Sequence, residues 1–146
     1  MLVMKVSLTG LSDFAKKFLA ELPKTETDSA HIVGLSGELG AGKTAFVQEV
    51  AKALGLSAPV TSPTFILARV YPINRPPFSR LVHIDAYRLS AEEKDTFGWG
   101  EYAKNPKNLI FAEWPERLPG GVPKGARVLR FAVTGEETRE ITESYA

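Results

Sequence analysis

Apolar residues near the start of the chain follow the spacing of an amphipathic helix. They fall at i, i+3, i+4, i+7, i+8 and i+11 of one stretch, namely Leu11, Phe14, Ala15, Phe18, Leu19 and Leu22. A helix with this stripe buries one face against a core. Ser12 is the predicted N-cap and Pro23 the predicted stop. The polar segment 23–29 then predicts a surface loop.

Short apolar runs bounded by turn residues predict the strands. The run 31–35 precedes a glycine-rich segment, and the runs 80–85 and 109–113 each end on an acidic residue. Residues 64–71 are rich in β-branched and aromatic side chains, and we expect Pro72, Pro76 and Pro77 to end that strand in a loop. Residues 127–133 and 138–142, separated by Gly135, predict a terminal β-hairpin.

Two further helices are expected. Apolar residues with helical spacing predict a helix over 43–54, followed by Gly55 at the position that favours glycine after a helix. Residues 90–93, Ser-Ala-Glu-Glu, form a capping box that opens a short helix. Beyond it, we expect Gly98, Gly100 and the Asn-Pro pair at 105–106 to interrupt regular structure.

The order of these elements predicts an α/β protein with a P-loop NTPase-like, three-layer fold. Its sheet is expected to be mixed, with a parallel core and antiparallel additions, which departs from a plain doubly wound fold. With 146 residues and neither internal repeats nor linker-like segments, the chain is predicted to be a single domain over residues 1–146.

Composition narrows the class of protein. The formal net charge of +1 gives no electrostatic case for direct binding of nucleic acid. The chain has no cysteine, which excludes disulfides, thiolate metal sites and a cysteine nucleophile. Polar residues follow the apolar start too soon for a signal peptide, and no apolar stretch is long enough to span a bilayer. We therefore expect a soluble cytoplasmic protein with no membrane association.

Residues 37–44, Gly-Glu-Leu-Gly-Ala-Gly-Lys-Thr, match the P-loop template G-x-x-x-x-G-K-[ST] without a mismatch, between an apolar strand and a predicted helix. Glycines in such a loop allow successive backbone N–H groups to surround a phosphate chain. Lys43 is expected to reach the β- and γ-phosphates, and the Thr44 hydroxyl to ligate Mg²⁺ at the helix N-terminus. The sequence thus predicts a site for a nucleoside triphosphate.

Chemistry on a magnesium–nucleotide complex also needs an acid at the carboxyl end of a strand near the P-loop. Asp85 and Glu113 are the two candidates, because each ends an apolar run. His83 would share a strand face with Asp85, as a core residue or as a catalytic one. Arg88 is either an arginine finger or a salt-bridge partner, and Trp114 either covers the nucleotide or packs internally.

The segment Thr61–Phe65 follows the P-loop helix, where switch I lies in P-loop GTPases. Its hydroxyl groups would either sense a γ-phosphate or cap a local Ser-Pro turn. A guanine-specifying Asn-Lys-x-Asp is missing, since the string at 105–108 reads Asn-Pro-Lys-Asn, which favours ATP over GTP. A small-molecule P-loop kinase remains the alternative, although Arg88 alone precedes Lys94 where a kinase lid would carry several arginines.

Four segments, taken together, resemble the TsaE family (older name YjeE), bacterial ATPases of the tRNA threonylcarbamoyladenosine pathway. They are the P-loop at 37–44, Ser-Pro-Thr-Phe at 62–65, His-Ile-Asp-Ala-Tyr-Arg at 83–88 and Glu-Trp-Pro at 113–115. The resemblance extends over about residues 10–142, and the last two segments are its most specific part. Glu38 stands where the family pattern usually has Asp.

This resemblance implies a Mg²⁺-dependent ATPase. Lys43 and Asp85 would serve hydrolysis, Thr44 and Glu113 would ligate Mg²⁺, and Arg139 would contact ATP. The implied phosphate-binding residues are Glu38, Leu39, Gly40, Ala41, Gly42, Lys43 and Thr44. The implied partner is the TsaB–TsaD heterodimer, in which TsaD transfers a threonylcarbamoyl group to a tRNA adenosine. ATP hydrolysis would reset that complex between turnovers, and tRNA would be met only indirectly, through the complex.

Overall fold

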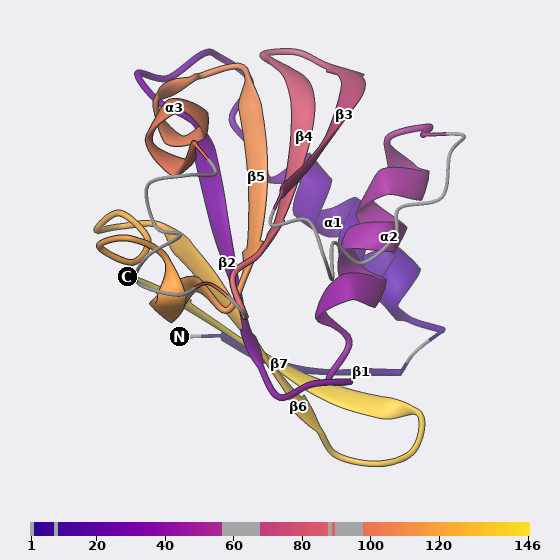
Figure 1. The fold of residues 1–146 in the computed structure, drawn as a ribbon. Helices are drawn as coiled ribbons and strands as arrows, with labels where there is room; N and C mark the ends of the chain where they lie inside the picture. Colours follow the sequence, from indigo (N-terminus) through magenta and orange to yellow (C-terminus); the bar gives the residue numbers. More distant parts are fainter. Residues whose placement is uncertain (1, 8, 57–67, 88, 90–97) are drawn as a thin grey trace.

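A computed structural model describes residues 2–7, 9–56, 68–87, 89 and 98–146. Within these residues, one seven-stranded sheet has the order β1-β7-β6-β2-β5-β4-β3 (Figure 1). Its parallel core consists of β6 (Arg127–Val133), β2 (His31–Gly37), β5 (Asn108–Glu113) and β4 (Phe78–Asp85). Antiparallel strands extend both sides, namely β3 (Ala68–Arg75) beside β4, β7 (Thr138–Tyr145) beside β6, and β1 (Leu2–Ser7) beside β7. The predicted mixed α/β sheet is confirmed.

Helices lie on both faces of this sheet, so that the protein has three layers (Figure 1). The helices α1 (Leu11–Ala20) and α2 (Lys43–Ala53) pack on one face, with a core built around four phenylalanines: Phe18, Phe46, Phe111 and Phe131. The short helix α3 (Trp99–Lys104) and the 3₁₀ turn η1 (Pro115–Arg117) lie on the other face, over a second core that includes Val82, Ile84, Trp99 and Ile110.

The parallel core brings the acidic strand ends to the P-loop. Asp85 and Glu113 are direct neighbours in the register of β4 and β5, and Leu35 of β2 lies opposite Glu113 on its other side. The Trp114 N–H donates to the Leu35 carbonyl oxygen at 3.1 Å, and the Ala86 N–H donates to the Glu113 carbonyl oxygen at 3.0 Å. These bonds fix the ends of three strands at one edge of the sheet.

Most predicted elements are present, and the ends of two helices show how sequence signals compete. Gly55 follows α2 with φ +81°, as expected. Ser12 as the N-cap of α1 is wrong, because the cap is Gly10 and its carbonyl already accepts the Phe14 N–H at 3.1 Å. The Gly10 N–H in turn donates to the Ser7 hydroxyl at 3.0 Å. Because α1 begins at Leu11, Ser12 lies inside the helix.

Proline and glycine misled the prediction at two other places. Pro72 lies within β3 instead of ending it, because an edge strand can place a residue without an N–H on its unpaired side. Gly98 does not interrupt regular structure but is the N-cap of α3, with φ +84°. Gly100 lies inside that helix. The helix α3 was not predicted as an element.

Several predicted features fall outside the described residues. They are the segment Thr61–Phe65, Arg88 and the capping box at 90–93. Among the helices that the structure does describe, none combines the length and the hydrophobicity needed to cross a membrane.

Candidate functional site

The P-loop joins the end of β2 to the first residue of α2, and its glycines have backbone conformations that disfavour side chains. Gly40 has φ +77° and Gly42 has φ +107°. At Gly37, where φ is +135°, a Cβ atom would lie 2.3 Å from the Phe131 carbonyl oxygen of β6. The predicted loop residues thus form a tight turn, and Gly37, its first residue, packs closely against β6.

Lys43 points back into this loop. Its Nζ donates to the carbonyl oxygens of Gly37 and of Glu38, the latter at 3.3 Å, and lies 4.1 Å from the centre of the Trp114 ring. Burial lowers the pKa of the Lys43 ammonium, while the nearby carboxylates, Glu113 foremost, act in the opposite direction. The cation is therefore held by loop carbonyls and an aromatic face.

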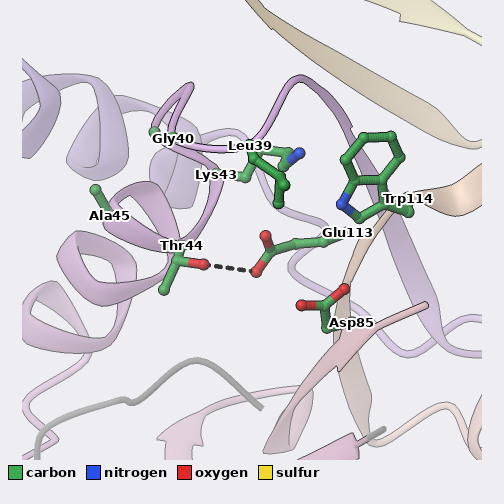
Figure 2. Close-up of a pocket in the computed structure, with 9 residues that line it drawn as sticks. Leu39, Gly40, Lys43, Thr44, Ala45, Asp85, Glu113 and Trp114 are labelled. Atoms are coloured by element: carbon green, nitrogen blue, oxygen red, sulfur yellow. Dashed lines mark hydrogen bonds between the residues drawn. The ribbon is translucent and has the colours of Figure 1, made fainter. Parts of the chain in front are cut away.

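Glu113 is the centre of a buried polar cluster. Thr44 Oγ1, on the first turn of α2, donates to Glu113 Oε2 at 2.9 Å (Figure 2). His83 Nε2, on β4, lies 2.5 Å from the same oxygen. His83 is completely buried and Glu113 nearly so, with 4% of its surface exposed. The two donors come from a helix and a strand, so the Glu113 carboxylate is fixed by rigid elements.

Asp85 lies beside this cluster and is more exposed to solvent than Glu113. Burial raises the pKa of the Asp85 carboxyl, and the neighbouring Glu113 charge raises it further. The Tyr87 N–H, which donates to Asp85 Oδ1 at 3.0 Å, acts in the opposite direction. An acid with a raised pKa in a cavity is a candidate for proton transfer.

One cavity of about 360 Å³ brings most of the predicted residues together. Figure 2 shows Lys43, Thr44, Asp85 and Glu113 around it. Its lining consists of Leu39, Gly40, Gly42, Lys43, Thr44, Ala45, Asp85, Glu113 and Trp114. The other two predicted loop residues, Glu38 and Ala41, line an adjacent cavity of about 330 Å³ along β6.

Arg139 lies at the flank of the P-loop rather than on the cavity lining. A Cβ atom at Gly42 would be 4.0 Å from its Cγ and Nε atoms. Its Nη1 donates to the carbonyl oxygens of Gly135 at 3.1 Å and Thr138 at 2.9 Å. The structure thus places Arg139 next to the loop, with its guanidinium bonded to the β6–β7 turn.

The donor atoms at the cavity suit a magnesium ion that is bound together with phosphates. Among the described residues, no three His, Asp or Glu side chains are grouped as a self-contained metal site. The candidate ligands are one hydroxyl, from Thr44, and one carboxylate, from Glu113. Mg²⁺ usually keeps several waters and takes one or two carboxylates plus substrate phosphates. This donor set therefore fits Mg²⁺ as a partner of a nucleotide.

Sequence reasoning did not find the group of aromatic and cationic side chains beside this site, in which Tyr87 and Arg117 pack with Trp114. Trp114 has φ +58°, which is uncommon for a residue with a side chain. Its ring centre lies 4.9 Å from that of Tyr87. The Arg117 guanidinium covers Tyr87 at 5.0 Å and Nη1 donates to the Tyr87 carbonyl oxygen. The closeness of Arg117 to the Glu-Trp-Pro segment was the available signal.

Comparisons with known proteins agree on one family. The family model described as "Threonylcarbamoyl adenosine biosynthesis protein TsaE" matches residues 7–141. The chain is 44% identical over 117 residues to the tRNA threonylcarbamoyladenosine biosynthesis protein TsaE of Streptomyces coelicolor, over 76% of this chain and 77% of the relative. It is 32% identical over 126 residues to the protein of that name from Bacillus subtilis, over 86% of this chain and 77% of the relative.

A solved structure has the same fold. The crystal structure of Bacillus subtilis YdiB superposes with a TM-score of 0.68 at 23% sequence identity, covering 99% of this chain and 84% of that chain.

Proposed function

Because this chain belongs to the TsaE family, we propose that it is a Mg²⁺-dependent ATPase that acts as an accessory protein in the formation of threonylcarbamoyladenosine in tRNA. The main support is the meeting of Lys43, Thr44, Asp85 and Glu113 around one cavity beside the P-loop. A cation for the phosphates, a hydroxyl and a carboxylate for Mg²⁺ and a further polar group for the attacking water are the parts that P-loop proteins use to hydrolyse a nucleoside triphosphate.

The P-loop residues would bind the phosphates. Lys43 would exchange the carbonyl oxygens of Gly37 and Glu38 for phosphate oxygens, since an ammonium prefers an anionic partner to a carbonyl. Thr44 and Glu113 would hold Mg²⁺. When bound there, the ion would supply positive charge that offsets the charge developing on the phosphates. Arg139, on the flank of the loop, would add a second cation near the nucleotide.

Asp85 would orient the attacking water and accept its proton. Its raised pKa makes the carboxylate a better proton acceptor than an ordinary aspartate. The hydrogen bond from the Tyr87 N–H to Oδ1 restrains the side chain, which leaves Oδ2 to face the water. Asp85 is therefore assigned to hydrolysis, whereas Glu113 is assigned to binding of the metal.

The proposed partner is a TsaB–TsaD-like heterodimer, and ATP hydrolysis would reset that complex between turnovers. The formal net charge of +1 is consistent with a role in which the partner carries most of the contact with tRNA. A protein with this charge balance has little electrostatic attraction of its own for the phosphate backbone.

The test is to measure release of phosphate from ATP by the chain alone, and then with the TsaB–TsaD pair from the same source. We expect slow hydrolysis alone and a rise with the pair, and Lys43→Ala should abolish both. An unchanged rate would contradict the accessory role. Transfer of the γ-phosphate to a small metabolite, instead of to water, would favour the alternative of a small-molecule kinase.

A further inference from the structure

His83 is buried on the P-loop side of the sheet, next to the proposed metal ligand. Its Nε2 lies 2.5 Å from Glu113 Oε2, and none of its surface is exposed. Within the described residues, its other ring nitrogen, Nδ1, is buried without a hydrogen-bond partner. A ring that carries a proton on Nε2 satisfies this arrangement, because the tautomer with its proton on Nδ1 would direct a lone pair at the carboxylate and bury an unpaired N–H.

The two oxygens of Glu113 consequently have different surroundings. Oε2 accepts hydrogen bonds from both Thr44 and His83. Oε1 makes no hydrogen bond that the described part of the chain supplies, and Figure 2 shows it turned away from Thr44, towards the side of Lys43. One oxygen of Glu113 is thus used to fix the side chain, and the other is left for a ligand in the cavity.

The fixed orientation requires His83 in addition to Thr44. In the register of the parallel strands, Glu113 is opposite Asp85, and His83 is opposite Phe111, two residues earlier. The Glu113 side chain therefore reaches back along the sheet to meet the imidazole. A hydrogen bond from the helix alone would leave the long carboxylate arm free to rotate about that contact.

We propose that His83 is a positioning residue for Glu113: it holds Oε2, together with Thr44, so that Oε1 is presented to Mg²⁺. This inference rests on the proposed function, because it assigns Glu113 to the metal. Neighbours that orient a metal ligand typically change metal affinity by about tenfold to hundredfold when they are removed. A histidine that only filled space in the core would have no such effect.

The first test compares binding of ADP in excess EDTA with binding at rising MgCl₂ concentrations. MgCl₂ should raise the affinity for ADP until the metal site is saturated. In His83→Leu, we expect the MgCl₂ concentration that gives half of this rise to be about tenfold to hundredfold higher, with the affinity for ADP in EDTA unchanged. His83→Gln keeps an N–H donor and should recover much of the loss. His31→Leu is the matched control, because His31 is the other histidine of the chain and begins β2 at the opposite end from the P-loop.

The second test needs no substitution of His83, so it applies even if His83→Leu fails to fold. Nitrogen chemical shifts of ¹⁵N-labelled histidine report the tautomer, and His31→Leu identifies the remaining signal. We expect the proton of His83 on Nε2, and a larger change in its shifts with ADP and MgCl₂ than with ADP and EDTA. A ring without a proton on Nε2 would overturn the proposal, because Nε2 could then not donate to Glu113.

The outcomes separate this proposal from the proposed function. If the unsubstituted protein binds ADP equally well with and without MgCl₂, the metal site itself is contradicted. If binding of ADP by the unsubstituted protein depends on MgCl₂, and binding by His83→Leu depends on MgCl₂ to the same degree, only the positioning role is overturned. In a Glu113→Gln protein, His83→Leu should have little further effect, because the two residues would act through one oxygen.

Discussion

Thr44 Oγ1 donates a hydrogen bond to Glu113 Oε2 across 2.9 Å, which joins the first turn of α2 to the end of β5. The two residues come from separate motifs, the P-loop and the Glu-Trp-Pro segment. In this contact the hydroxyl and the carboxylate converge on one small region of the cavity. A hydroxyl and a carboxylate group that meet in this way can share a metal ion, the carboxylate through its other oxygen, and the contact therefore links both motifs to a single function.

Glu113 and Asp85 should differ in their effects on binding and turnover. We expect Glu113→Ala to weaken nucleotide binding in the presence of Mg²⁺ by about tenfold or more, because a metal ligand is lost. Asp85→Ala should leave binding unchanged and slow hydrolysis by about a hundredfold to ten-thousandfold, the range typical of a general base. Equilibrium titration with and without Mg²⁺, together with phosphate release, distinguishes the two. Normal binding by Glu113→Ala and impaired binding by Asp85→Ala would reverse the assignment.

Lys43→Ala should weaken binding of ATP by about tenfold to hundredfold, the effect of removing a charged hydrogen-bond donor, and should abolish hydrolysis. The matched control is Lys52→Ala on the same helix, since Lys52 is 72% exposed and pairs with Glu49 on the surface. We expect this control to keep the affinity and turnover of the unsubstituted protein. A Lys43→Ala protein with unchanged affinity and turnover would contradict the role assigned to the Lys43 ammonium.

Gly37→Ala should destabilise the fold more than Gly40→Ala. Both glycines have positive φ, which costs a residue with a side chain about 1–3 kcal/mol. At Gly40 nothing lies within 4 Å of an added Cβ atom, whereas at Gly37 the Phe131 carbonyl oxygen is 2.3 Å away. The urea dependence of unfolding measures the difference. Equal losses of unfolding free energy at the two positions would show that β6 moves to accommodate the added methyl group.

The fold and the site were predictable to different degrees from the sequence. Hydrophobic runs that end in Asp85 and Glu113 predicted two strand ends near the P-loop, and the register places them side by side. The P-loop glycines were recognisable because the template specifies backbone conformation as well as residue type. Such features depend on residues that are close together in the chain, so the sequence alone predicts them.

The remaining features depend on contacts between distant segments. The bond between His83 and Glu113 required the register of β4 against β5, which no local pattern encodes. Pro72 looked like a strand end because its position at the sheet edge was unknown. Gly98 looked like an interruption, although a glycine with positive φ also serves as the cap of α3. In each case the tertiary environment decided between two uses of the same residue.

Asp85→Asn should stabilise the protein without nucleotide at neutral pH. Because the pKa of Asp85 is raised above its ordinary value of 3.8, the folded state disfavours the carboxylate. The raised pKa therefore contributes stability below the ordinary value, and this contribution is lost as the pH rises through the folded pKa. Asparagine can still accept the Tyr87 N–H through Oδ1.

Thermal unfolding of both proteins between pH 3 and pH 7 measures this effect. The advantage of Asp85→Asn should grow as the pH rises above about 3.8 and should level off above the folded pKa. An advantage that is constant with pH would mean that the substitution acts through packing instead of through the charge. An advantage that shrinks as the pH rises would show that the pKa is lowered in the folded protein.

Trp114 should report the movement of Lys43 when a nucleotide binds. The Lys43 ammonium lies 4.1 Å from the centre of the indole ring, in a contact worth about 0.5–2 kcal/mol. Phosphates would draw the cation from the ring, and the fluorescence of Trp114 should change. Trp99 must first be replaced by Phe, because it packs in the core on the other face of the sheet and would add a constant signal.

The Trp99→Phe protein should therefore change its emission with ADP and with a non-hydrolysable ATP analogue, each in MgCl₂. Trp114→Phe, which retains only Trp99, is the matched control and should show little change. We expect the two nucleotides to give different spectra, because the γ-phosphate adds a further partner for Lys43. If both nucleotides bind at equilibrium and Trp114 emission stays that of the free protein, then Lys43 keeps its place over the ring. Phosphate binding would in that case rest on the backbone N–H groups of the loop, and the role assigned to Lys43 would be wrong.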